Sequence, residues 1–361
     1  MNTYKIQIQS FLFVSLAFLL FGCASETGRV GFGAKPVAYG MVNQLVIIAD
    51  DDIWEGAVGD SLRYYYEGPY LILPQPESIF DLKHYNARDI TIEPLRKELS
   101  AYIILANLSD KDSPVTQMVI KDIGKKNVDR SKGDPSYNCP LSRDRWARNQ
   151  LVFYQFGWSH KQLIENIVDN FPVVSKKIEK IYKPNIEATT YYSGNDHGLR
   201  KLVQGEVGAE IRIPSDYIEA QNEDGFIWLR KYTRKQKSNL LFKKIPYTDK
   251  TQLTEEGIKA IRNELTKKYI SSTEENSYVK INDVDLPMFT SVKTINGNYV
   301  IEAKGIWEME NDYMAGPFIS YLIYNKDKKD LLFIDGFILA PKSQKRNFMQ
   351  ELEYILSTVK Y

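Results

Sequence analysis

From residue 45 onward, short runs of β-branched and aromatic residues alternate with stretches that have the periodicity of amphipathic helices. This alternation constrains the fold more than any other feature, because strands and helices that follow one another in turn form a sheet covered by helices. Between the first two runs, apolar residues recur at every fourth position from Trp54 to Tyr66, which predicts a helix with one apolar face. Four runs in the first half of the chain predict strands: LVIIA, YLIL, AYIILANL and LVFYQFG.

Capping residues predict where two helices of this first half begin. Ser113 precedes Pro114, and a hydroxyl residue followed by proline is typical of a helix N-terminus. Ser159 is followed three residues later by Gln162, which is the spacing of a capping box. The first half therefore predicts a mixed sheet with helices.

The pattern changes after about Tyr192, where the sequence YYSGNDHG interrupts the periodicity and marks a domain boundary. Strands beyond it are separated by short polar turns such as Asn296-Gly297, a favoured two-residue hairpin turn. Successive hairpins favour antiparallel pairing, so we expect an antiparallel meander with helices on one face. The expected fold class is α+β in two domains, residues 44–192 and 193–361. Seven runs predict the strands of the second domain: FIWLRKYT, SNLLFKKIPY, SYVKI, FTSVKTI, YVIEAKGIWEME, FISYLIYN and LLFIDGFILA.

The N-terminus has the organisation of an export signal. Lys5 precedes a run from Phe11 to Phe21 that is apolar except for Ser15 and is about half the ~20 residues that a membrane-spanning helix needs. The run ends in Leu20-Phe21-Gly22-Cys23, which resembles the lipobox of bacterial lipoproteins. This resemblance implies that residues 1–22 are a signal peptide and that lipid is attached to Cys23. Such a lipid would hold the protein on a bilayer, because each buried methylene contributes about 0.8 kcal/mol.

Cysteine content and charge limit how the protein can be stabilised and which partners it can bind. Cys139 is the only other cysteine, so lipidation of Cys23 leaves no internal disulfide, and stability depends on apolar cores. Residues 23–43 are rich in glycine without periodicity and are expected to form a lipidated tether. Lys and Arg number 47 against 46 Asp and Glu, so no basic field predicts a nucleic-acid partner. We expect a lipid anchor in the outer membrane and a body that faces the periplasm.

Six segments, taken in order, carry a family resemblance over nearly the whole mature chain: DDDIWEGAVGDSLR, LPQPESIFDL, WARNQLVFYQFG, GFIWLRKY, GIWEMENDYMAGPF and FIDGFILAPKSQKRNFMQELEYIL. They are similar to a Bacteroidota-type lipoprotein family of unknown function, domain of unknown function 4837. The resemblance implies an envelope lipoprotein of α+β character. It implies no reaction and supplies no catalytic residues.

The segment ADDDIWEG, residues 49–56, raises the question of a metal or catalytic site. Asp50, Asp51 and Asp52 follow a predicted strand and are candidate ligands for Mg²⁺ or Ca²⁺, which bind oxygen atoms. The same acids suit a helix N-terminus, because Asp52 and Glu55 have the spacing of a capping box. Capping needs no further residues, and the segment lacks the alternating ligands of a regular calcium loop. We therefore expect a cap and no metal.

A second acidic group, GIWEMENDYMAG, combines the acids Glu308, Glu310 and Asp312 with Trp307 and Tyr313. Carboxylate pairs and aromatic faces are what a glycan-binding or glycan-cleaving site uses. Glu308 and Glu310 are two apart on a predicted strand, so both face the same side. The alternative, which we expect, is a half-exposed strand that ends in a polar hairpin.

No other group of residues specifies a reaction. His84, His160 and His197 lie in separate segments without metal-binding spacing, and Asp196-His197 has no accompanying serine motif. Cys139 has no histidine near it in sequence. The sequence contains neither a phosphate-binding glycine loop nor a dinucleotide motif. We expect no cofactor and no catalytic residues.

The sequence as a whole predicts a lipid-anchored envelope protein that binds another envelope protein and is not an enzyme. Tyr and Trp carry binding energy at interfaces, and the chain has 24 Tyr and 5 Trp, enough to serve both core and interface. The alternative is a glycan-binding or glycan-cleaving lipoprotein that uses the region of Glu308. A concave cleft lined by Trp and two carboxylates would favour the glycan, and a flat apolar patch would favour a protein partner.

Overall fold

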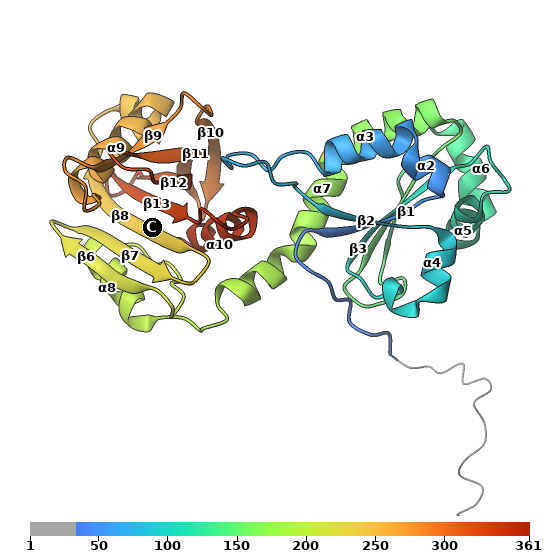
Figure 1. Cartoon of the computed structure of the whole chain (residues 1–361), viewed down its shortest axis with the longest axis horizontal. Coiled ribbons are helices and arrows are strands. Elements are labelled where there is room, and N and C mark those ends of the chain that lie inside the picture. The colour runs from blue at the N-terminus through green and yellow to red at the C-terminus, as the bar shows by residue number, and fades with distance from the viewer. Residues whose placement is uncertain (1–33) are drawn as a thin grey trace, which may run out of the picture. The chain divides into compact units, whose positions relative to one another are not determined.

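The first part of the structure, from β1 to α7, is called the N-half here and contains a five-stranded sheet of order β2-β1-β3-β5-β4 (Figure 1). The structure is a computed structural model that describes residues 34–361, so Cys23 and the expected signal peptide lie outside the described residues. β1 pairs in parallel with β2 and β3, β3 pairs in parallel with β5, and the edge strand β4 is antiparallel to β5. The elements are β1 Gln44–Ile48, α2 Asp51–Glu55, α3 Ala57–Tyr66, β2 Asp81–Tyr85, α4 Ala87–Ile92, η1 Pro94–Lys97, β3 Ala101–Asn107, α5 Pro114–Ile123, α6 Lys125–Gly133, β4 Leu141–Arg143, β5 Leu151–Gly157 and α7 His160–Thr190.

The central strands of this sheet are apolar on both faces. Every residue of β5 is buried, as is every residue of β3 except the last, because helices cover both sides. The helices α2, α3 and α7 pack on one face, and α4, α5 and α6 pack on the other. The predicted caps are confirmed, since the Ser113 and Ser159 hydroxyls accept backbone N–H groups at the starts of α5 and α7.

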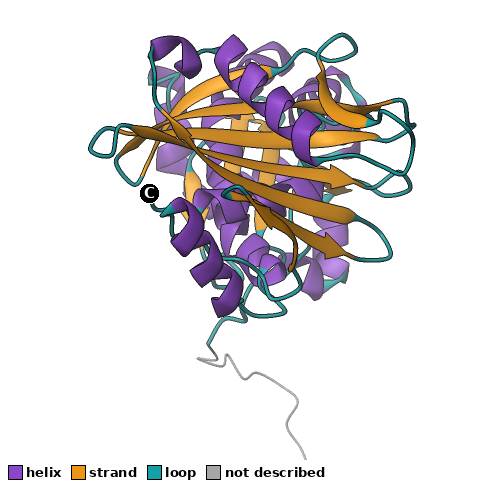
Figure 2. Cartoon of the chain, turned by 90° about the vertical axis from the view of Figure 1, so that its left-hand side faces the viewer, coloured by secondary structure: helices purple, strands orange, loops and turns teal. Residues whose placement is uncertain are grey.

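The second part, from α8 to α10, is called the C-half and contains an antiparallel sheet of order β10-β11-β12-β13-β8-β7-β6. The remaining strand, β9, pairs with the end of β11 that β10 leaves free. Figure 2 shows the strands of this larger sheet fanned side by side. The elements are α8 His197–Val207, β6 Ile218–Glu223, β7 Phe226–Tyr232, β8 Lys237–Pro246, η2 Lys250–Leu253, α9 Glu255–Tyr269, β9 Tyr278–Asn282, β10 Phe289–Ile295, β11 Asn298–Glu310, β12 Ala315–Asn325, β13 Asp330–Leu339 and α10 Arg346–Ser357.

The α+β class and the antiparallel second sheet are confirmed, but helices cover both faces of that sheet. The helices α8 and α10 pack on the face that contains Leu332 and Ile334, whereas α9 packs on the face that contains Leu331 and Phe333. The expectation of helices on one face is therefore wrong in this respect. A continuous apolar run such as that of β13 has no polar side to leave in water, so both of its faces need a cover.

A buried ion pair joins α9 to the sheet beneath it. The Arg262 guanidinium donates to both carboxylate oxygens of Asp335, over 3.0 and 3.2 Å, and the two side chains are 1% and 0% exposed. The Ser320 hydroxyl donates to the same carboxylate at 2.5 Å. The guanidinium also lies 3.9 Å from the centre of the Phe318 ring. This cluster ties α9, β12 and β13 together inside an otherwise apolar layer.

An arm, residues 68–79, leaves the N-half after α3 and packs on the C-half. The run Tyr70 to Leu73, predicted as a strand, forms a turn of this arm, so that prediction is wrong. Ile72 and Leu73 are buried in the C-half core with residues of α8 and α10. Ile72 has a φ of 78°, which is unfavourable for a β-branched residue. Ile72 and Leu73 are buried, as their apolar character predicts, but their partners belong to the other half of the chain, and Leu71 is exposed.

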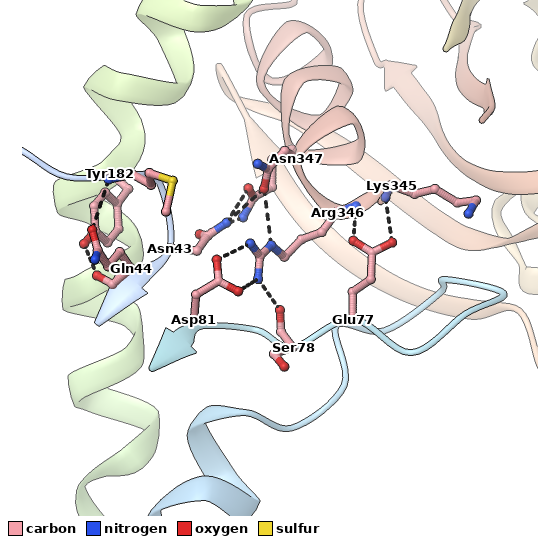
Figure 3. A network of polar contacts seen from close by, with 11 residues as sticks. Asn43, Gln44, Glu77, Ser78, Asp81, Tyr182, Lys345, Arg346 and Asn347 are labelled. Carbon is pink, nitrogen blue, oxygen red and sulfur yellow. Dashed lines mark hydrogen bonds and ion pairs between the residues drawn. The ribbon is translucent and has the colours of Figure 1, made fainter. Parts of the chain in front are cut away.

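Polar contacts fix the arm and β2 to α10 (Figure 3). The Glu77 carboxylate accepts the backbone N–H groups of Lys345 and Arg346 at 2.6 and 2.9 Å, so it caps α10 from the other half. The Arg346 guanidinium donates to both carboxylate oxygens of Asp81, at 3.2 and 2.7 Å. Residues Val37–Tyr361 accordingly form one compact unit. Among the described residues no helix is both long enough and apolar enough to cross a membrane.

Candidate functional site

The carboxyl ends of β1 and β3 form the edge of the N-half sheet at which open α/β sheets bind ligands. The strand order reverses here, because β1 has β2 on one side and β3 on the other. A crevice at such a reversal is the common ligand site of doubly wound sheets. The predicted acids Asp50, Asp51 and Asp52 directly follow β1, so they lie at this edge.

Asp50 uses its carboxylate to satisfy the N-terminus of a neighbouring helix. It accepts hydrogen bonds from the hydroxyl of Ser113, the N-cap of α5, and from the backbone N–H of Val115. Burial raises the pKa of Asp50 above its usual value, and the bonds from Ser113 and Val115 oppose that rise. Helix N-termini bind anions because their first N–H groups lack partners. In this chain Asp50 takes the position that an anionic ligand would occupy at α5.

The helix after β1 begins earlier than predicted, so the assignment of Asp52 as its cap is wrong. The N-cap of α2 is Asp50, which has φ −66° and ψ 150° and makes no side-chain capping bond, since its carboxylate reaches α5 instead. Asp51 and Asp52 are exposed in the first turn, and the Asn86 amide lies 3.3 Å from both carboxylate oxygens of Asp51. Across residues 34–361, no three His, Cys, Asp or Glu side chains are grouped to hold a metal ion.

The second acidic group is divided between the two faces of β11. Trp307 is 2% exposed, donates its indole N–H to the carbonyl of Ile338 at 3.2 Å, and belongs to the core under α9. Glu308 and Glu310 share the Lys280 ammonium, at 3.2 and 2.5 Å. These hydrogen bonds raise the pKa of Lys280, so it remains charged beside the two acids. The structure thus pairs Glu308 and Glu310 as predicted but separates them from Trp307.

The remaining candidates have structural partners. His84 stacks on Trp54, with ring centres 4.8 Å apart and planes within 6°. Asp196 caps α8, whose first residue is His197, so its carboxylate serves the helix. Burial raises the pKa of the Cys139 thiol to about 12, which leaves little of the reactive thiolate at neutral pH.

Strand β10 offers an open edge of the C-half sheet that the sequence does not mark. Six of its seven residues are exposed. Asn296 and Gly297, with φ of 49° and 86°, form the predicted two-residue turn to β11. In such a hairpin alternate residues turn their backbone groups toward the partner strand, which leaves those of Thr290, Val292 and Thr294 directed outward.

This edge lacks the features that commonly protect edge strands. β6, at the opposite edge, has a register irregularity between Glu219 and Gln221, whereas β10 pairs with β11 in one continuous register. β10 contains no proline, and its one lysine, Lys293, is bonded to Glu302 of β11. An exposed and regular strand edge readily accepts a further strand. The arrangement suits an extended segment of a protein partner.

Two exposed apolar side chains lie among the polar residues of this edge. Val292 is 63% exposed, and Tyr299, its diagonal neighbour on the same face, is 41% exposed. All five tryptophans of the chain are buried or half-buried, so none forms an exposed platform for a sugar ring. The exposed aromatic side chains of the described residues are instead Tyr and Phe.

The fold is that of a two-part α+β protein, and its candidate sites are the acidic groups and the open edge of β10. Residues 197–358 match a family described as Domain of unknown function (DUF4837), so the resemblance to that domain is confirmed for the C-half and does not extend over the whole chain. Residues 38–185 match a different family, Domain of unknown function (DUF8532). No curated protein matches the chain.

Two of the solved structures that are similar to part of the chain are of Mog1. The Ran-binding protein Mog1p of Saccharomyces cerevisiae is 11% identical, with 42% of this chain and 89% of that chain covered and a TM-score of 0.28. A mutant of protein Mog1 is 13% identical, with the same coverage and the same TM-score. Likeness at this level carries no conclusion about function.

Proposed function

We propose that this chain is a lipid-anchored protein of the outer membrane that faces the periplasm and binds another envelope protein without catalysis. The observation that carries the proposal is the open edge of β10, an exposed and regular strand whose outward backbone groups need a partner. A partner segment in extended conformation would add a strand there. Main-chain hydrogen bonds would supply affinity, and contacts with Val292 and Tyr299 would supply specificity.

The state of the acidic groups supports a role without chemistry. Asp50 is bonded to the start of α5, and Glu308 and Glu310 share Lys280, so each of these acids has an internal partner. A general acid or base must come within hydrogen-bond distance of the proton that it transfers, and here these carboxylates are directed to internal partners. The glycan alternative would also need an aromatic face beside Glu308, and Trp307 points into the core.

The membrane anchor contributes to binding as well. Lipid on Cys23 would confine the body to one surface, which raises the effective concentration of partners held there. An interface made by a single added strand could therefore be occupied even if it is weak in solution. Replacing Cys23 by Ala should release the protein from the membrane fraction or leave it unprocessed, which fractionation and mass measurement would reveal.

Photocrosslinking in living cells tests the binding surface. A photoreactive amino acid at Val292 should give one recurrent protein adduct, whereas the same probe at Ile218 of the β6 edge should not. The two positions are matched, because both are β-branched, on edge strands, and 63% and 58% exposed. Val292→Pro should abolish the adduct of a probe at Thr294, since it removes an outward N–H without breaking the ladder to β11.

Two results would contradict the proposal. Adducts that form equally at Val292 and Ile218 would mean that β10 is not the interface. Retention of the protein on immobilised envelope glycans, lost in Glu308→Gln but not in Val292→Pro, would favour the glycan alternative.

A further inference from the structure

A second exposed apolar surface lies where the described chain begins. Val37, Tyr39 and Met41 alternate along an extended segment, and they are 52%, 48% and 65% exposed. The residues between them, Ala38 and Gly40, are half-buried. Successive residues of an extended chain face opposite sides, so this segment has its large apolar side chains on the solvent side. That is the reverse of the usual pattern.

The backbone of this segment is held in place by the N-half sheet. Val37 pairs with Arg148 just before β5, and Tyr39 pairs with Leu99 just before β3. The Ala38 N–H donates to the Arg148 carbonyl at 2.8 Å. The apolar side chains are therefore presented by a fixed edge of the fold, at the amino ends of β3 and β5.

Leu95 of η1 borders this segment, and Ile92 precedes Leu95 by three residues in the chain. The Tyr39 hydroxyl donates to the Leu95 carbonyl at 3.3 Å, so the two residues are neighbours. Leu95 is 56% exposed, and Ile92, at the end of α4, is 66% exposed. These residues are called the N-terminal ridge: Val37, Tyr39, Met41, Ile92 and Leu95. Exposed apolar side chains gathered in one place mark a surface that meets a partner or a membrane.

We propose that the N-terminal ridge docks on the surface of the bilayer that holds the lipid anchor. This inference rests on the proposed anchoring at Cys23. Only residues 24–36 separate Cys23 from Val37, and the tether that the sequence predicts there would span about 20 Å. The ridge is therefore the part of the folded body that the tether holds nearest to the membrane.

The chemistry of the ridge fits a membrane interface. Val37, Met41, Ile92 and Leu95 are aliphatic, and Tyr39 has an apolar ring with a polar end, which suits the boundary between headgroups and acyl chains. Arg148, beside Val37, is also exposed and can direct its guanidinium to lipid phosphates. A lipid and a docked surface are two membrane signals, and together they would hold the body in one orientation.

The test uses the processed, lipidated chain in vesicles of phosphatidylethanolamine and phosphatidylglycerol. A photoreactive amino acid at Leu95 should crosslink to phospholipid severalfold more than the same probe at Val284, which is 92% exposed in the C-half. The double variant Tyr39→Ser, Met41→Ser should lose most of the lipid adducts at Leu95. Because both side chains are exposed, its thermal unfolding should match that of the parent.

Each outcome decides one part of the inference. A chain that floats with the vesicles but forms no phospholipid adduct at Leu95 would overturn the docking of the ridge and leave the anchor intact. Protein adducts in place of lipid adducts at Leu95 in cells would assign the ridge to a protein partner and also overturn it. A processed chain found in the supernatant would refute anchoring at Cys23, and with it both proposals.

Discussion

Replacing Asp335 by Ala should destabilise the protein by about 3 kcal/mol or more, because it leaves the guanidinium of Arg262 buried without a counter-charge. Removing one partner of a buried ion pair costs about 3–5 kcal/mol. The lower part of this range is expected here, since the Phe318 ring, 3.9 Å from the guanidinium, still offers a cation–π contact. One guanidinium nitrogen of Arg262 already lacks a hydrogen-bond partner within the described chain, so the loss of Asp335 cannot be compensated nearby.

Removing both charges should cost far less than removing one. The double variant Arg262→Met, Asp335→Leu keeps apolar volume in the layer, and such replacements are often neutral or stabilising by about 1–4 kcal/mol. It leaves the Ser320 hydroxyl without its acceptor, which costs about 1–3 kcal/mol. Adding Ser320→Ala should recover that loss. Comparing these variants with Asp335→Ala separates the free-energy cost of burying the two charges from the contribution of their side chains to packing.

Scanning calorimetry measures both effects. A change of 1 kcal/mol shifts the midpoint by about 2–4 °C for a cooperative unit of 150–250 residues, so Asp335→Ala should lower it by about 6 °C or more. The control is Asp283→Ala, which breaks the half-exposed pair with Lys259 on the same helix and should cost less than about 1 kcal/mol. Equal shifts for Asp335→Ala and Asp283→Ala would refute the reasoning.

Three further perturbations follow from the site and the arm. Burial raises the pKa of Asp50 above 3.8, so its contribution to stability is present in acid and is lost as the pH rises through the raised pKa. Asp50→Asn keeps an acceptor for the start of α5 and should gain stability over the parent as the pH rises through that window; a constant difference between their melting midpoints would contradict this. Glu77→Ala should cost about 1–2 kcal/mol and speed hydrogen exchange in the first turn of α10, while Glu67→Ala, an exposed acid at the end of α3, should change neither. Cys139, with a pKa near 12, should react with iodoacetamide much more slowly in the folded protein than in denaturant, and equal rates would show that burial does not control the thiol.

Most strands of this protein follow from local sequence, because β-branched and aromatic runs between turn residues need only their own pattern to be recognised. The strands β2, β4 and β6 were not predicted, because their sequences are largely polar. The Asn296-Gly297 hairpin is a clear case, since both residues adopt the positive φ that such a turn requires. The caps at Ser113 and Ser159 were predictable for the same reason. Strand order, and therefore the exposure of β10, depends on pairings between distant segments and has no local signal.

The errors arise where a side chain has a distant partner. Asp52 has the local spacing of a cap, but α2 begins at Asp51 and its N-cap is Asp50. The Asp50 carboxylate is bonded to Ser113, the N-cap of α5, a partner that the local sequence does not reveal. Ile72 lies in a run with strand character whose burial depends on the C-half. Trp307 differs from these, since neighbouring residues of a strand face opposite sides, and that rule already separates it from Glu308.

Because Glu77 caps α10, near the C-terminal end of the sequence, the arm can pack on the C-half only after α10 has been synthesised. The two residues of the cap contact, Glu77 and Arg346, are 269 positions apart, so synthesis delivers the acceptor long before the amides that it binds. A product that ends before α10 would leave Glu77 without those amides and remove much of the apolar surface that buries Ile72. Such a fragment would expose the arm as an extended, protease-accessible segment. In the full-length chain Ile72 and Leu73 are buried, so a protease should cut the arm more slowly there than in such a fragment.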